Sequence, residues 1–182
     1  MLEIVKKFFT KLFFMNEEKY QETISHYTEK FQLKQNWNFS VVSNLPDVKS
    51  NYPDKTKVLA FTNWTGLCVI FKDSIMSMPT FIARAYIRHE LRHCQQMEKI
   101  HELMLKKEGE LLANIFTCMI ITNDNKNGYD KSIMEADAWA AFFGINLNIK
   151  KVVRKIINNS MPFIMEWIRG PYNLGPLFFF IC

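Results

Sequence analysis

The sequence predicts an α+β fold that is mostly helical, with one helix lying beside a short β-hairpin. Apolar residues recur at helical spacing through most of the chain. Residues 58–62 and 67–72 are strand-like runs, and the turn-like residues 63–66 between them indicate a hairpin. A chain of 182 residues with 48% hydrophobic residues is long enough to bury a sizeable core. We therefore expect one domain over residues 1–182.

Three parts of this domain differ in composition. Residues 1–33 are expected to be a helical N-terminal segment, residues 58–145 the core, and residues 146–182 a helical and aromatic extension. Residues 1–15 form a basic amphipathic pattern in which Lys11 interrupts the apolar run, and no small-residue cleavage site follows. Both features argue against a secretory signal and a membrane span. We expect this helix to dock on the core, and peripheral contact with a membrane surface is the alternative.

Charge and cysteine content exclude several classes. The net charge of +5 is spread along the chain without a long Lys/Arg run, so we expect no nucleic-acid partner. The 4 cysteines are widely spaced and form no Cys-x-x-Cys pair, which predicts neither a disulfide framework nor a cysteine zinc cluster. This pattern indicates a reducing compartment such as the cytoplasm, and it leaves the oligomeric state open.

The most informative motif lies in a helix predicted over residues 80–99. His89 and His93 are four residues apart, so they share a helix face and can bind one Zn²⁺. Glu90 follows the first histidine and can deprotonate a water molecule held by the ion. Counting 100° per residue puts both histidines on the inward, apolar stripe. They could instead be core histidines, but burying imidazoles without strong partners is costly, which favours a metal.

A catalytic zinc site needs a third protein ligand from another element. After a loop expected at residues 123–128, a helix is predicted to begin near Ser132 and to carry Glu135 and Asp137. Glu135 is the preferred ligand and Asp137 the alternative, since about 200° separates them around the helix. Ser132 and Glu135 also fit a capping box, in which the glutamate would bond the helix N-terminus instead of a metal.

The segment from Arg88 to Gln96, followed some forty residues later by Glu135 to Ala140, resembles the gluzincin metallopeptidases. It is similar in particular to small bacterial and phage proteins with a His-Glu-x-x-His helix and a later Glu-Ala-Asp helix. The resemblance covers residues 58–145 and is specific at the two motifs. It implies a zincin fold, a zinc ion and peptide-bond hydrolysis. Many of those relatives carry a further glutamate where this chain has Ile133.

Together these observations predict a zinc-dependent peptidase in which His89, His93 and Glu135 hold Zn²⁺ and Glu90 is the general base. A peptide substrate could pair with the edge of the strand at residues 67–72. The alternative is a non-catalytic module that zinc stabilises and that binds a membrane or a protein partner, although such a site would not need Glu90. A latent enzyme covered by its own termini, and iron in place of zinc, also remain open. The oxyanion-stabilising candidates are Tyr86, Arg92 and Tyr129.

Overall fold

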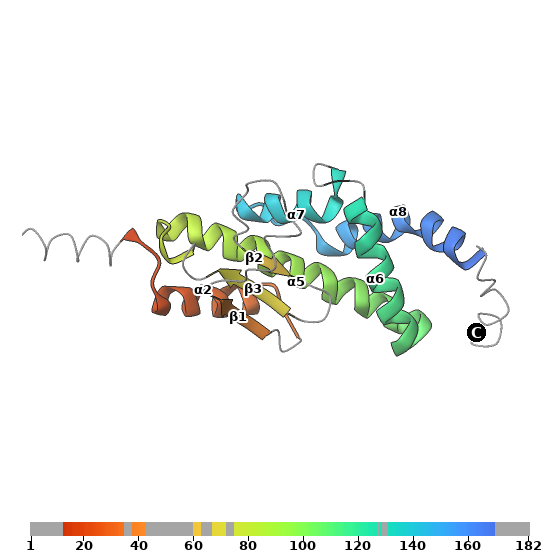
Figure 1. The fold of residues 1–182 in the computed structure, drawn as a ribbon, viewed down its shortest axis with the longest axis horizontal. Helices are drawn as coiled ribbons and strands as arrows, with labels where there is room; N and C mark the ends of the chain where they lie inside the picture. Colours follow the sequence, from red (N-terminus) through yellow and green to blue (C-terminus); the bar gives the residue numbers. More distant parts are fainter. Residues whose placement is uncertain are drawn as a thin grey trace, which may run out of the picture.

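The computed structural model describes residues 13–34, 38–42, 60–62, 67–71, 75–126, 128 and 131–169. Within these residues five long helices form the body of the molecule. Helix α5 runs along the middle, with α2 and three short strands on one side and α7 and α8 on the other (Figure 1). The helices are α2 (Glu17–Lys30), α5 (Thr80–Glu108), α6 (Glu110–Lys126), α7 (Ile133–Phe142) and α8 (Ile149–Arg169).

The strands β1 (Asn38–Val42), β2 (Ala60–Thr62) and β3 (Leu67–Phe71) form a small mixed sheet in the order β1-β3-β2. Strand β3 pairs in parallel with β1 and antiparallel with β2. Because β3 is hydrogen-bonded on both sides, it has no free edge. The expectation that a substrate peptide adds to the strand at residues 67–72 is therefore wrong.

The expected fold class also needs correction. The protein is not an α+β fold of the zincin type built on a helix and a hairpin; it is a mostly helical protein. The strands are only five, three and five residues long, and they form a minor element beside α5. The reason is that most of the described apolar burial takes place between helices, which the helical periodicity along the chain already favoured.

Helix α5 begins where the sequence predicts, directly after Pro79, but it continues to Glu108 instead of ending near residue 99. No helix-breaking residue occurs before Gly109, whose φ of 81° lies in the left-handed region that favours glycine. The amide of Gly109 bonds the carbonyl of Leu105, and its own carbonyl accepts the amide of Ala113 in α6. One glycine thus ends α5 and begins α6.

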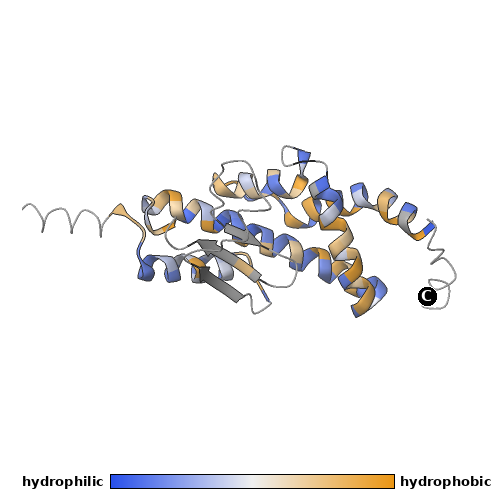
Figure 2. Cartoon of the chain, viewed as in Figure 1, coloured by the Kyte–Doolittle hydropathy of each residue, from blue (hydrophilic) through white to orange (hydrophobic). Residues whose placement is uncertain are grey.

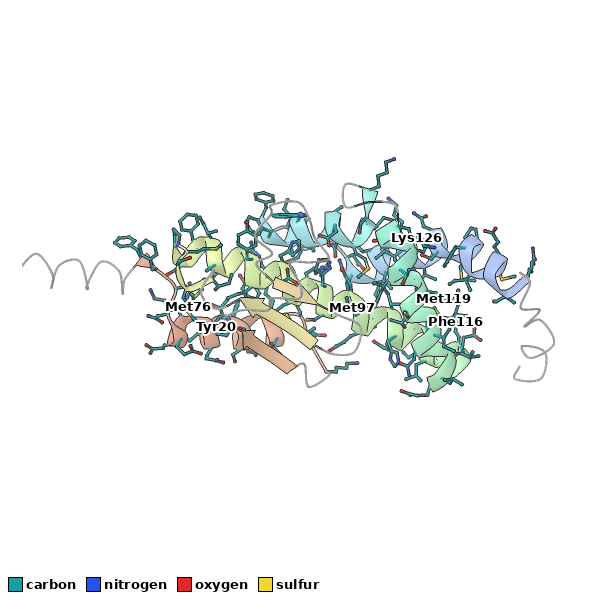
Figure 3. The ribbon with its side chains drawn as sticks, viewed as in Figure 1. Tyr20, Met76, Met97, Phe116, Met119 and Lys126 are labelled. Atoms are coloured by element: carbon teal, nitrogen blue, oxygen red, sulfur yellow. The ribbon has the colours of Figure 1, made fainter. Side chains whose placement is uncertain are left out.

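The hydrophobic core lies between α5 and the helices around it. Helix α6 contacts both α5 and α8, and Figure 2 shows apolar segments along it. Figure 3 places Tyr20 on α2, Met97 on α5 and Phe116 on α6, and all three side chains are buried. The largest fully buried aliphatic side chains are Ile75, Ile87, Leu91, Ile100, Ile120, Val153, Ile156 and Ile164.

The loop expected at residues 123–128 is wrong for its first four residues, which belong to α6. Tertiary contacts explain the extension of the helix. The side-chain amide of Asn123 donates to Ser160 Oγ at 3.2 Å, and the carboxylate of Asp124 accepts amides from the start of α7. Polar residues that favour a loop locally are therefore held in a helix by their partners.

Within the described part of the chain, no helix combines the length and the apolar character needed to cross a bilayer. The N-terminal amphipathic pattern lies mostly in residues 1–12, and the aromatic C-terminal residues lie in 170–182. Both segments are outside the described residues. The expectations about a membrane surface and about covering termini therefore remain predictions.

Two adjacent leucines in α6 test this packing, because Leu112 is 8% exposed and Leu111 is 71% exposed. Replacing Leu112 with alanine should lower the free energy of unfolding by about 2–5 kcal/mol, since it removes buried apolar contacts and leaves a cavity. The matched change Leu111→Ala should cost less than about 1 kcal/mol. Urea denaturation measures both. Equal losses at the two positions would contradict the orientation of α6.

Candidate metal centre

The two histidines of the motif are buried on α5 and point to the same place. His89 and His93 are 5% and 7% exposed, which confirms that they lie on the inward stripe of the helix. Their spacing of four residues brings the two Nε2 atoms to 3.2 Å. The indole of Trp139 packs edge-on against the His89 ring, with 4.8 Å between ring centroids, and limits its rotation.

Glu135 comes from α7 and completes the cluster. Its Oε2 lies 3.5 Å from His89 Nε2, and its Oε1 lies 3.4 Å from His93 Nε2. In a tetrahedral zinc site with bonds of about 2.0–2.1 Å, neighbouring donor atoms are separated by about 3.3–3.4 Å. Glu135 approaches the two imidazoles through different oxygens, and with one donor atom taken from each residue all three atoms lie within 4.8 Å of one another. His89, His93 and Glu135 could therefore hold one metal ion.

Unpartnered polar atoms support the fit to a metal. Among the described residues, Glu135 Oε2 and His89 Nδ1 are both buried and make no hydrogen bond. Two ring nitrogens facing each other at 3.2 Å can share only one proton comfortably. A cation between the three donors would satisfy both rings and the carboxylate, whereas simple core histidines would leave them unsatisfied.

The capping-box interpretation of Glu135 is wrong for its side chain. Ser132 is the N-cap of α7, and its hydroxyl accepts the amide of Glu135 at 3.1 Å. In a capping box the glutamate would reach back to the N-cap, but here it turns toward the histidines. The amide of Ser132 donates to the carbonyl of Gly128 instead, and Asp124 of α6 accepts the amides of Ile133 and Met134 at 3.1 Å and the Ser132 hydroxyl. The start of α7 is thus capped without the carboxylate of Glu135.

Asp137, the alternative ligand, is directed elsewhere. It lies on another side of α7, as the angular separation from Glu135 predicts. Both of its oxygens accept from the guanidinium of Arg92, at 2.7 and 2.9 Å. It is 2% exposed, and Arg92 is 3% exposed. Arg92 and Asp137 therefore form a buried ion pair between α5 and α7.

The charges of the cluster are strongly coupled. Burial lowers the pKa of His93, but the hydrogen bond and negative charge of Glu135 outweigh it and raise that pKa from 6.5 to about 9. Burial likewise raises the pKa of Glu135, but the adjacent imidazoles of His89 and His93 bring it well below its usual range. In the metal-free site the positive charge of His93 is therefore stabilised by the negative charge of Glu135.

Glu90 lies at the edge of this cluster. It is 8% exposed, and its Oε1 is 4.0 Å from His89 Nε2. The carboxylate is therefore close to the three donors without being one of them. This position is suited to a group that accepts a proton from a molecule bound beside the donors.

Two of the three oxyanion candidates can be placed. The guanidinium of Arg92 is already occupied by Asp137 and by the carbonyl of Leu147. Tyr86 is half-buried and packs edge-on against Phe142, with 5.0 Å between ring centroids. Tyr129 lies outside the described residues.

Sequence reasoning missed two residues that shape the site. Gln96 is fully buried, and its Oε1 lies 2.9 Å from His93 Nδ1. Its position three residues after His93 places it on the same helix face, which was a usable signal. Asp124 gave no local signal, because its partners lie across a turn in α7.

The coupled pair predicts a pH-dependent stability of the metal-free protein. The raised pKa of His93 contributes stability that is complete below about 6.5 and is lost as the pH rises through about 9. The lowered pKa of Glu135 contributes stability above about 4.5 that is lost at lower pH. In EDTA, the melting temperature should fall between pH 6.5 and pH 9. His93→Gln should flatten this fall and the exposed control His26→Gln should not; a flat wild-type profile would contradict the pairing.

No protein-family model, curated protein or solved structure matches this chain. The resemblance to gluzincin metallopeptidases therefore stays a prediction that rests on two motifs. The structure contributes an independent observation, because it brings both motifs together from α5 and α7 into one set of donors.

Proposed function

We propose that this protein is a zinc-dependent peptidase. The observation that carries the proposal is the buried cluster of His89, His93 and Glu135, whose donor atoms are close enough together to hold one metal ion, with Glu90 beside them. A purely structural zinc site would have four protein ligands and no need of a nearby base. Among the described residues only these three form a group of possible ligands, which favours a catalytic site with an open position.

Each residue has a distinct role in the proposed reaction. His89, His93 and Glu135 hold the ion, which when bound polarises the substrate carbonyl and makes water more acidic. Glu90 accepts the proton of the attacking water and then donates it to the nitrogen of the leaving amine. The burial of His89 and Glu90 limits access of bulk water, which strengthens the electrostatic interactions within the site.

The proposed substrate is a peptide or protein, and the proposed compartment is the cytoplasm. The first part rests on the resemblance to metallopeptidases and on the position of Glu90. The second part rests on the buried cysteines Cys68 and Cys94 and the partly buried Cys118, none of which is in a disulfide in the described part of the chain. Reduced thiols are the usual state of cysteine in a reducing compartment.

Replacing Glu90 with glutamine tests the general base. The neutral amide keeps the size of the side chain but cannot accept the proton, so zinc content should remain near one equivalent while turnover falls by about 10²–10⁴-fold. Mass spectrometry measures the metal, and cleavage of a peptide library measures turnover. A Glu90→Gln variant that retains wild-type turnover would disprove the mechanism.

Removal of a ligand tests the metal site itself. His93→Ala and Glu135→Ala should each lose most of the bound metal and all measurable cleavage, because two remaining donors bind zinc weakly. Glu22→Ala, which removes an exposed carboxylate on α2, is the control and should bind zinc as the wild type does. Mass spectrometry also identifies the metal and distinguishes zinc from iron. Bound zinc with no cleavage of any peptide would instead favour the zinc-stabilised binding module.

A further inference from the structure

We propose that Arg92, Asp137 and Gln96 form a positioning chain that fixes the ring of His93 for metal binding. This inference rests on the proposed metal site, but not on the peptidase reaction. None of the three residues is among the ligands or at the reacting position. All three are buried, with exposures of 3%, 2% and 0%.

The amide of Gln96 can adopt only one orientation. Its Nε2 donates one hydrogen to Asp137 Oδ2 at 2.7 Å and the other to the carbonyl of Met134 at 3.0 Å. A rotation of the amide by 180° would place its oxygen against these two oxygen acceptors. The Oε1 atom must therefore face His93 Nδ1, from which it is 2.9 Å away.

Asp137 is held in the same way from the other side. Arg92 Nε and Nη2 donate to the two carboxylate oxygens at 2.7 and 2.9 Å. Arg92 Nη2 also donates to the carbonyl of Leu147 at 2.8 Å, which ties the guanidinium to the segment before α8. A guanidinium only donates and an ionised carboxylate only accepts, so the direction of every hydrogen bond in the chain is determined.

This direction determines which nitrogen of His93 carries hydrogen. Because Gln96 Oε1 can only accept, Nδ1 of His93 must be the donor. The lone pair available for a metal is then on Nε2, which is the atom that faces His89 and Glu135 at 3.2 and 3.4 Å. Metal-bound histidines are commonly oriented by a hydrogen bond at the other ring nitrogen.

The two histidines are therefore prepared differently. His89 Nδ1 has no hydrogen-bond partner within the described structure, and its ring is oriented by packing against Trp139. His93 alone is oriented by a hydrogen-bonded chain. Loss of the positioning chain should therefore lower metal affinity through His93, by more than a general loss of stability would.

The first experiment removes the acceptor with Gln96→Leu. In metal-free protein labelled with ¹⁵N-histidine, the wild type should show a slowly exchanging Nδ1–H of His93, which the variant should lose. Zinc affinity, measured by chelator competition, should fall by about 10- to 100-fold. Thr117→Val, which removes a buried hydroxyl bonded to the carbonyl of Ala113 on α6, is the control for lost stability and should keep both properties.

The second experiment exchanges the chemical groups. Gln96→Glu places two carboxylates side by side, and Asp137→Asn removes the charge that Arg92 pairs with, so each should lower zinc affinity by about 10- to 100-fold. The double variant restores a donor at position 137 and an acceptor facing His93, and should bind zinc more tightly than either single variant. This recovery would not follow from a purely structural role.

Two results would overturn the proposal. One is wild-type zinc affinity in Gln96→Leu, and the other is a double variant whose loss of affinity is the sum of the two single losses in free energy. Absence of peptide cleavage by the zinc-loaded wild type would contradict the peptidase function alone. The Nδ1–H signal of His93 is measured without metal, so it tests the positioning chain even if the wild type binds no zinc.

Discussion

The arrangement of the site depends on the buried ion pair between Arg92 and Asp137. This pair joins the middle of α5 to α7, and it places the two helices so that a carboxylate from one reaches imidazoles on the other. Breaking such a pair on one side costs about 3–5 kcal/mol, because the remaining charge stays buried without a partner. The pair is therefore a strict constraint on how α7 can lie against α5.

The two acidic residues of α7 contact different groups on α5. Glu135 and Asp137 are two positions apart, so they start from different sides of α7, yet both side chains reach α5. One reaches the histidines, and the other reaches Arg92 and Gln96 on the same neighbouring helix. Both contacts are possible because α5 is long enough to present several turns to α7. The second acidic residue thus stabilises the position of the first.

The sequence predicted which residues come together at the candidate site better than it predicted the fold. His89, His93 and Glu135 follow from helical spacing and the chemistry of zinc, both of which are local rules. The strand at Asn38–Val42 had no comparable sequence signal. The β content of the fold was overestimated because a short strand-like run has the same sequence pattern in a small sheet as in a large one. Asp124 could not be found because its partners are set by the turn between α6 and α7.

The single glycine between α5 and α6 restricts which residues position 109 can accept. Gly109 has a φ of 81° and no heavy atom near the position of an added Cβ, so a larger residue there would meet backbone strain and no clash. Position 109 therefore favours glycine for its backbone conformation alone, at the junction from which α6 carries Asp124 to the start of α7.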